Sequence, residues 1–257
     1  MMASWKRTSL EDTFEYCKGY PKKKDDTTLD ANARFYMNKI VCKPHGALIE
    51  EILKNWYGDY RRLESHHGYI QWLFPIRENG LNRDAQELQL HEIEKICGNK
   101  TAHARVLRAY KMMLDFYGMK LGDDESGKIE RANNSKDRFQ HLNKSSHNHL
   151  RITRILKCLG ELGYEHLKKP FIEFILHEAI VEGTLSNLLR SCCNYWIDIL
   201  RKDDDREAVW KYYGFLNEVQ TKYISDEMHE GSMKIQDKSM SEQKTEQKKV
   251  SAKTKAK

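Results

Sequence analysis

The sequence predicts an all-α fold, in the form of a single multi-helix domain of antiparallel packed helices. Apolar residues recur at helical spacing in most long segments, most regularly over 103–117. Glycine and proline stand where these helices would end, and the short connections between the last helical segments favour antiparallel neighbours. No aromatic residue follows Tyr223, so we expect residues 225–257 to form a disordered C-terminal tail.

The first half of the predicted domain is marked by clear helix ends. Gly58 can adopt the left-handed conformation after one helix, and Asp59 can cap the next by accepting a backbone hydrogen bond. Pro75 ends that second helix because proline has no N–H to donate. The predicted helices cover residues 29–40, 47–57, 60–74 and 103–117, with a weaker helical signal over 82–94 and a short helix at 10–17.

The second half begins with a predicted β-hairpin near 119–131, where MKLGDDESGKIERA alternates around a polar loop. Pro170 in a first turn and Gly183 after a last turn delimit one of the following helices. The predicted helical segments are a short one at 136–142, then 149–162, 170–182, 185–200 and a final helix from residue 206 past residue 216.

We divide the chain into a polar and partly ordered N-terminal segment (1–28), the helical domain (29–224) and a tail rich in Lys, Glu and Ser (225–257). The start of the chain has no apolar core of a signal peptide, and no apolar run reaches the roughly 18 residues of a membrane span. We therefore expect no transmembrane segment, which leaves peripheral membrane association open. The six cysteines form no CxxC pair, as expected for reduced thiols in a cytosolic or nuclear protein.

The predicted helix 60–74 has a second face opposite its apolar stripe. On a helical wheel Trp72 points away from the stripe, and Ser65 and Gly68 lie on the same side as Trp72. A small-residue notch beside a tryptophan can admit another helix, and this is the favoured interpretation. The same residues could form an aromatic wall of a peptide-binding groove.

Glu178 falls inside the apolar stripe of the predicted helix 170–182. A buried carboxylate must be paired or protonated, so we expect an ion pair with an Arg or Lys of a neighbouring helix. The alternatives are an anchor for the ammonium group of a ligand, or simple exposure to solvent.

Catalytic and cofactor motifs are missing from the sequence. His141, His147 and His149 cluster, but no cysteine or carboxylate completes a zinc-binding spacing, and we expect neither a metal nor a cofactor. HExxH, GxSxG and phosphate-binding glycine loops are absent, which indicates that the protein is not an enzyme.

Basic residues suggest two weaker possibilities. Arg151, Arg154 and Lys157 lie on one helix side, but without aromatic interleaving we expect a solvated surface and consider nucleic-acid binding unlikely. Short lysine runs are candidate nuclear-import signals, which would recruit import factors as partners. They comprise Lys22, Lys23, Lys24, Lys248 and Lys249.

Several blocks between about residues 29 and 200 resemble the opioid growth factor receptor conserved region. These blocks are RFYMNKI, GALIEEI with WYGDY, YIQWLFPIRENGLN, AYKMMLDFYGMKL and HNHLRITRILKCLGELGY. The resemblance implies an α-helical, non-transmembrane receptor for the opioid pentapeptide Met-enkephalin. It also implies a location in the nucleus and perinuclear cytoplasm, and a link to negative regulation of cell proliferation.

The chain departs from this resemblance after residue 200. Family members tend to be Arg-rich there, whereas Asp203 to Asp205 cancel the basic charge in this sequence. The resemblance does not separate the receptor from its receptor-like paralogue. The alternative function is a helical nuclear scaffold that binds protein or nucleic acid through a basic surface and the Lys-rich tail.

Overall fold

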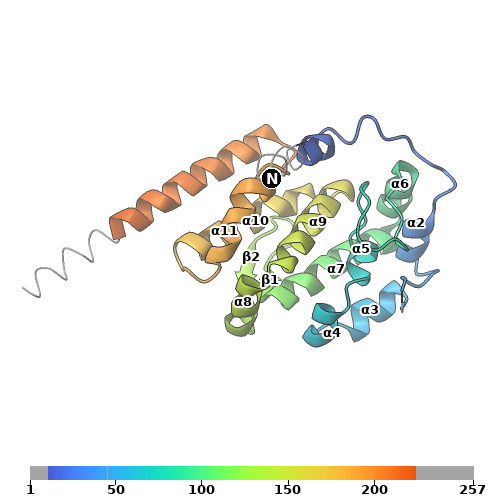
Figure 1. The fold of residues 1–257 in the computed structure, drawn as a ribbon, viewed down its shortest axis with the longest axis horizontal. Coiled ribbons are helices and arrows are strands. Elements are labelled where there is room, and N and C mark those ends of the chain that lie inside the picture. Colours follow the sequence, from blue (N-terminus) through green and yellow to red (C-terminus); the bar gives the residue numbers. More distant parts are fainter. Residues whose placement is uncertain (1–10, 45, 224–257) are drawn as a thin grey trace, which may run out of the picture. The chain divides into compact units, whose positions relative to one another are not determined.

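A computed structural model describes residues 11–44 and 46–223 (Figure 1). The chain divides into two compact units, Met1–Tyr212 and Tyr213–Lys257, and only the end of one helix is described in the second. The predicted disordered tail at 225–257, with Lys248 and Lys249, lies outside the described residues.

The all-α prediction is confirmed, because the described residues contain many helices and one two-stranded sheet. The first part of the chain contains a helix over 11–17, then α2 (Ala31–Tyr36), α3 (Ile49–Asn55), α4 (Tyr60–Ser65), α5 (Tyr69–Leu73), α6 (Leu90–Gly98) and α7 (Lys100–Tyr117). The hairpin strands β1 (Met119–Leu121) and β2 (Ile129–Arg131) follow, then α8 (Ser135–Lys144), α9 (His147–Glu161), a 3₁₀ turn η1 (Glu165–Leu167) and α10 (Lys168–Ile180). The 3₁₀ turn η2 (Ser186–Leu188), α11 (Leu189–Ser191), the π-helical turn η3 (Cys192–Trp196) and a helix over 203–223 complete the order.

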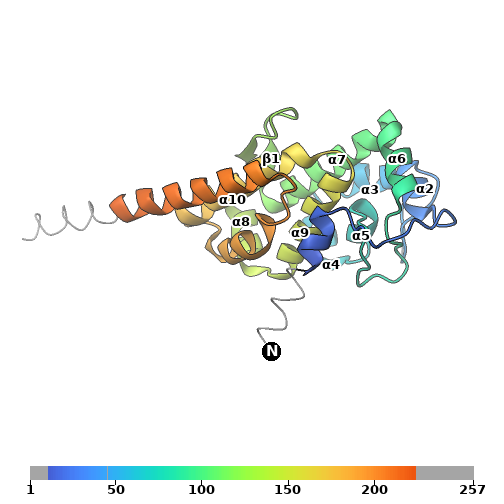
Figure 2. The ribbon, with the colours of Figure 1, turned by 90° about the horizontal axis from the view of Figure 1, so that it is seen from above.

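Helix α7 lies in the middle of the first unit and contacts α2, α3, α6 and α8 (Figures 1 and 2). It begins at Asn99, whose side chain accepts a hydrogen bond from the Ala102 N–H, and ends at the left-handed Gly118. The apolar stripe that the sequence predicts over 103–117 is buried against α9 and α10. The three helices meet around a small apolar space lined by Tyr110, Met113, Leu114, Tyr117, Ile152, Ile155, Leu156 and Phe171.

The predicted hairpin is confirmed as an antiparallel pair in which Met119 faces Arg131 and Leu121 faces Ile129. Ile129 and Met119 are buried, so the hairpin packs one of its faces inward.

The predicted helix 60–74 is wrong as a single element, because the chain leaves the helix between α4 and α5. If the helix continued, the carbonyl oxygens of Leu63 and Glu64 would accept hydrogen bonds from backbone N–H groups about four residues later in the chain. Instead the Arg151 guanidinium donates to Leu63 O at 2.9 Å and to Glu64 O at 3.2 Å. His66 is extended at this point, with ψ of 115°. A cation from α9 thus caps the end of α4, which is favourable at a helix C-terminus.

The notch beside Trp72 is filled by a loop rather than by a helix. Trp72 is only 2% exposed, packs against the Phe35 ring at 5.4 Å and donates its indole N–H to Lys43 O at 3.0 Å. A Cβ on Gly68 would lie 3.1 Å from Pro44 Cδ, so the Lys43–Pro44 segment uses the space that glycine leaves.

Two further predicted segments differ from the structure. Helix α6 begins at Leu90 rather than near residue 82. Gln89 precedes its first turn, and the Glu92 carboxylate accepts a hydrogen bond from the Gln89 N–H. The predicted helix 185–200 is split into η2, α11 and η3. The π-helical turn brings the buried Trp196 indole onto Thr153 Oγ1, at 2.8 Å.

The helix over 203–223 opens with the three aspartates that interrupt the basic pattern of the sequence. Acidic residues in a first turn are stabilised by the N-terminal end of the helix dipole. The acidic run of Asp203 to Asp205 therefore has a local structural role at a helix start, and Asp203 pairs with Arg206.

Candidate functional site

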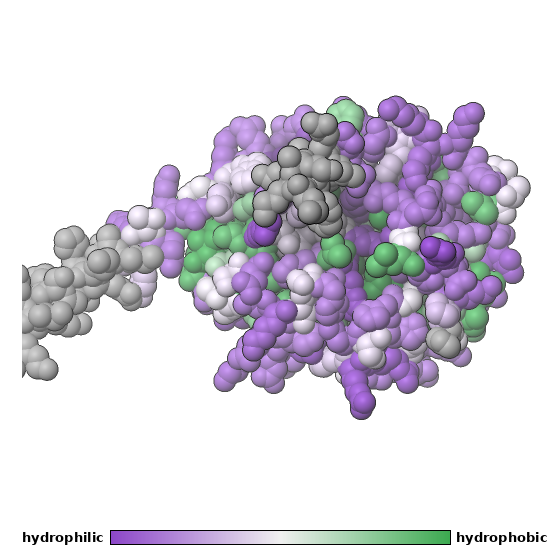
Figure 3. Space-filling view, in the orientation of Figure 1, coloured by the Kyte–Doolittle hydropathy of each residue, from purple (hydrophilic) through white to green (hydrophobic). Residues whose placement is uncertain are grey.

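A groove lies between the segment 67–82 and α9, with a volume of 570 Å³. Ligand pockets are typically about 300–1,000 Å³. Ile70 and Ile76 are buried in its wall, whereas Leu81 and Leu150 stand beside it with 99% and 68% of their surface exposed. Figure 3 shows apolar side chains exposed on the face over α5 and α9. We call this feature the groove throughout.

Side-chain amides hold the loop that follows α5 and forms one wall of the groove. Gln71 Nε2 donates to Asn82 O at 3.0 Å, and the Asn82 N–H donates to Gln71 Oε1 at 2.6 Å. Asn82 Nδ2 donates in turn to the carbonyls of Lys43 and Gly68, at 2.6 and 3.2 Å. A Cβ on Gly80 would come within 2.4 Å of the Gln71 side chain, so only glycine leaves room for this arrangement.

Three cations of α9 form the opposite wall, spaced three residues apart. Arg151 is buried and satisfies the two carbonyls at the end of α4. Lys157 is also buried and pairs with Glu78 at 2.7 Å. Arg154 lies between them and donates its Nε–H to Phe74 O at 2.8 Å. Burial lowers the pKa of Arg154 from its ordinary value.

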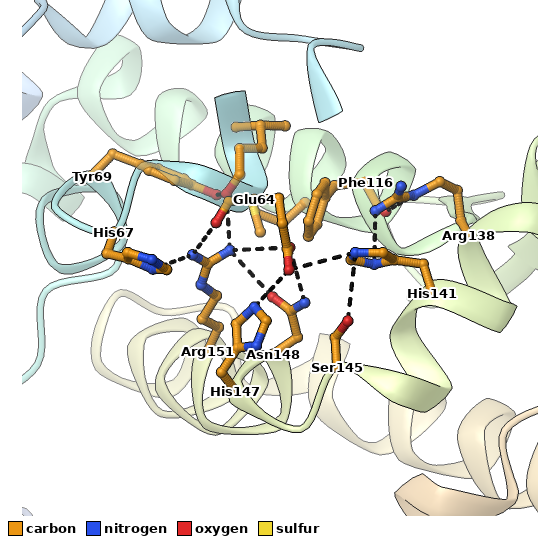
Figure 4. A network of polar contacts seen from close by, with 12 residues as sticks. Glu64, His67, Tyr69, Phe116, Arg138, His141, Ser145, His147, Asn148 and Arg151 are labelled. Carbon is orange, nitrogen blue, oxygen red and sulfur yellow. Dashed lines mark hydrogen bonds and ion pairs between the residues drawn. The ribbon is translucent and has the colours of Figure 1, made fainter. Parts of the chain in front are cut away.

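A network around Glu64 extends from the groove along α9 (Figure 4). His147 Nε2 lies 2.8 Å from Glu64 Oε1, His141 Nε2 lies 3.5 Å from the same atom, and Asn148 donates to Glu64 Oε2 at 3.2 Å. Although burial alone would raise the pKa of Glu64, the hydrogen bond from Asn148 and the nearby cations lower it. Glu64 is therefore held as a carboxylate.

The histidines of this region have separate environments. His147 and His67 line the groove, with His67 Nδ1 3.0 Å from Arg151. His141 faces Glu64, and burial together with Arg138 lowers the pKa of His141. His149 instead contacts Ser191 Oγ at 3.1 Å. Within 11–44 and 46–223, no group of three His, Cys, Asp or Glu side chains is arranged to hold a metal ion.

The predicted ligand-binding residues do not gather at one place. Gly68 lines the groove, but Trp72 is buried beneath the Lys43–Pro44 segment and Ser65 is exposed at the last turn of α4. The helical wheel that placed these three residues on one face is incorrect here, because the helix is interrupted between Ser65 and Tyr69.

Glu178 lies on α10, away from the residues that line the groove. Its two carboxylate oxygens accept hydrogen bonds from Nε and Nη2 of Arg131, both at 2.7 Å, and Thr184 Oγ1 donates to it at 2.6 Å. Glu178 is 3% exposed. The structure therefore confirms the ion pair that the sequence predicts for this buried carboxylate. The partner, Arg131, lies on strand β2 and not on a neighbouring helix.

The lysines at 22–24 lie in an exposed loop before α2. Lys23 pairs with Glu87 at 2.7 Å, and its side chain is 36% exposed. Lys22 and Lys24 are exposed, so this segment is accessible to a binding partner.

The residues that define the groove were only partly visible in the sequence. The spacing of Arg151, Arg154 and Lys157 was visible, but it indicated a solvated surface. Leu81 and Leu150 could have indicated the groove, because each is an apolar residue among polar neighbours and lies outside the apolar stripes of the predicted helices. An apolar residue that has no place in a core is a candidate for contact with a partner.

No helix among the described residues is long and apolar enough to cross a membrane. No solved structure matches the chain.

Comparisons with known proteins identify the family. Residues 24–227 match the opioid growth factor receptor conserved region. The chain is 51% identical to opioid growth factor receptor-like protein 1 of Mus musculus over 79% of this chain and 44% of that protein. It is 44% identical to the opioid growth factor receptor of Rattus norvegicus over 80% of this chain and 36% of that protein. It is 41% identical to the opioid growth factor receptor of Homo sapiens over 82% of this chain and 32% of that protein.

The chain thus spans less than half the length of these curated relatives. The match covers almost all of the described helical region and includes both walls of the groove. The chain belongs to the opioid growth factor receptor family.

Proposed function

We propose that this chain binds the opioid pentapeptide Met-enkephalin in the groove, as a receptor that restrains cell proliferation. The observation that carries the proposal is the groove itself, which combines apolar walls, two exposed leucines and a few charged groups at a volume suited to a pentapeptide. The names of the relatives from Rattus norvegicus and Homo sapiens, opioid growth factor receptor, support the choice of ligand. In this proposal the protein acts by binding, not by catalysis.

Calorimetric titration of the full chain with Met-enkephalin, against a scrambled peptide of the same composition, tests the proposal. We expect heat of binding with the first peptide and much weaker binding with the second. Equal heats from the two peptides would refute specific recognition.

A variant locates the binding in the groove. Replacing Leu150 by Ser should weaken binding about 10- to 100-fold, because burying a leucine side chain contributes about 1.5–3 kcal/mol. Leu90, which is 46% exposed on α6 and outside the groove, provides the matched control Leu90→Ser. Loss of affinity in both variants alike would place the peptide elsewhere.

The proposed location is the nucleus and perinuclear cytoplasm, with import factors bound at Lys22, Lys23, Lys24, Lys248 and Lys249. The exposure of the segment at 22–24 supports this part of the proposal. Microscopy of a fluorescent fusion, with these lysines replaced by Gln in one run at a time, tests it. If the nuclear fluorescence is unchanged in both variants, these lysine runs are not the import signals.

The alternative scaffold function has less support on α9. A phosphate-binding surface needs accessible cations. Arg151 and Lys157 are 7% and 6% exposed and are engaged by carbonyl groups and by Glu78, so they are poorly placed for a nucleic-acid backbone.

A further inference from the structure

Arg154 differs from its two neighbours on α9 because it has no ion-pair partner among the described residues. Arg151 lies 3.9 Å from Glu64, and Lys157 lies 2.7 Å from Glu78. Arg154 uses its Nε–H on Phe74 O, and no carboxylate of the described residues lies within 4.0 Å of its guanidinium nitrogens. Its two terminal nitrogens also make no hydrogen bond within the described part of the chain.

This arrangement leaves the two terminal nitrogens of Arg154 available for a ligand. The side chain is half-buried, and burial lowers its pKa, although the charge of Glu78, which lines the same groove and pairs with Lys157, acts in the opposite direction. Buried charges in proteins are normally paired. The planar guanidinium offers two parallel N–H groups, which match the two oxygens of a carboxylate.

The rest of the groove limits what could supply that carboxylate. Ile70, Ile76 and the rim residues Leu81 and Leu150 are apolar, so a small hydrated anion would leave them uncovered. A ligand that fits must combine apolar side chains with one negative group. A short apolar peptide with a free carboxyl end has this composition.

We propose that the groove binds an apolar peptide by its free C-terminal carboxylate, which Arg154 receives through its two terminal nitrogens. The inference rests on the proposed function, because it assigns a direction to the peptide in the same groove. The apolar side chains then lie against Ile70 and Ile76, and Leu81 and Leu150 cover them.

Titration of the full chain with four peptides tests this assignment. They are Met-enkephalin with a free carboxyl end, its C-terminal amide, and the acid and amide forms of a scrambled peptide. We expect the acid of Met-enkephalin to bind about 10- to 100-fold more tightly than its amide, since a charge-assisted hydrogen bond contributes about 1.5–3 kcal/mol.

The four results separate the two proposals. If Met-enkephalin binds equally as acid and amide, the role of Arg154 is wrong and the proposed function stands. If both acids bind equally and both amides bind weakly, carboxylate recognition stands and specificity for Met-enkephalin fails. If an internal acidic group is what the groove requires, adding a glutamate to the amide will restore its affinity, and the C-terminal assignment is wrong. If no peptide binds, both proposals fail.

A variant ties the effect to one side chain. Arg154→Gln should make acid and amide bind alike, whereas the matched control Arg190→Gln, at an exposed arginine outside the groove, should keep the difference. Thermal melting shows whether each variant folds. If Arg154→Gln does not fold, Arg154→Lys is the second variant. It keeps the positive charge but loses the two parallel N–H groups, so it should reduce the ratio of the affinity for the acid to the affinity for the amide. An unchanged ratio in a folded Arg154 variant overturns the assignment.

Discussion

Three buried tyrosines differ in what their hydroxyl groups contact. Tyr69 donates its hydroxyl to Leu63 O at 3.0 Å, next to the Arg151 guanidinium. Tyr110 and Tyr117 are equally buried on α7, but their hydroxyl oxygens have no partner among the described residues. A buried hydroxyl without a partner has lost its hydrogen bonds to water and gained none.

Removing these hydroxyls should therefore have unequal effects. Tyr69→Phe should lower the free energy of unfolding by about 1 kcal/mol, because it removes a hydrogen bond and leaves Leu63 O with fewer donors. Tyr110→Phe should leave the free energy of unfolding within about 0.5 kcal/mol of the wild type, or raise it. Urea denaturation measures both. An equal loss in the two variants would mean that Tyr110 does have a hydrogen-bond partner.

Glu178 shows how far residue-scale prediction from the sequence reaches. The helical wheel placed it inside an apolar stripe, and the need for a cationic partner followed from the chemistry of a buried carboxylate. The identity of the partner did not follow, because Arg131 lies 47 residues earlier in the chain, on a hairpin strand. A periodicity describes one element and carries no information about which element packs against it.

At the scale of elements, α7 and the break between α4 and α5 behave differently. Helix α7 was predictable because its cap, its apolar stripe and its terminal glycine all lie within its own sequence. The break at residues 66–68 was not predictable, because the donors that replace the helical N–H groups come from Arg151 on α9. Tertiary contacts decided this boundary against the local helical pattern.

Arg151→Met should therefore destabilise the junction of α4 and α5. The change leaves Glu64 O without its donor and removes a cation beside the Glu64 carboxylate, so we expect a loss of about 2–4 kcal/mol in the free energy of unfolding. Arg61→Met, on the exposed side of α4, is the matched control and should change it by less than about 0.5 kcal/mol. Denaturant titration compares the two, and a similar small loss in both would show that Arg151 does not cap α4.

At the scale of the first unit, Lys168 joins segments that are distant in the chain. It is fully buried at the start of α10, and its ammonium group donates to Tyr16 Oη at 2.6 Å and to Ile199 O at 2.9 Å. Tyr16, on the helix over 11–17, donates in turn to Lys157 O on α9 at 3.0 Å. The N-terminal helix is thereby fixed to α9 and α10, although it precedes the residues that match the family.

The burial of Lys168 should make the stability of the protein depend on pH in a defined direction. Desolvation lowers the pKa of Lys168 to about 8 from 10.5, despite the neighbouring Glu165. Between these values the unfolded chain holds the proton and the folded chain has released it. Stability therefore rises with pH, by about 1 kcal/mol per pH unit. Below pH 8 both states are protonated and this contribution is constant.

Buried tyrosines and cysteines have raised pKa values and act in the opposite direction at high pH, so the effect must be measured as a difference. The free energy of unfolding of the wild type minus that of Lys168→Met should increase by about 2 kcal/mol from pH 8 to pH 10. Lys169→Met, which removes the ion pair between Lys169 and Glu173 at the next position of α10, is the comparison variant. A constant difference for Lys168→Met would contradict a lowered pKa.

The groove belongs to the same scale, since its lining comes from Pro44, the segment 67–82 and residues 147–157. The family resemblance, confirmed by the match over 24–227, placed these segments in one domain. It did not place them side by side. Their juxtaposition depends on Gln71, Asn82 and Arg151, which act between segments and leave no periodic trace in the sequence.

The amide pairs between Gln71 and Asn82 have a consequence for the rate of ligand capture. These hydrogen bonds hold the loop after α5 in place in the free protein, so a peptide that binds in the groove as proposed would have little protein to reorganise. Association then needs no slow closing step and should proceed at the ordinary rate of about 10⁵–10⁷ M⁻¹s⁻¹. Differences in affinity among ligands would accordingly lie in how long each one stays bound.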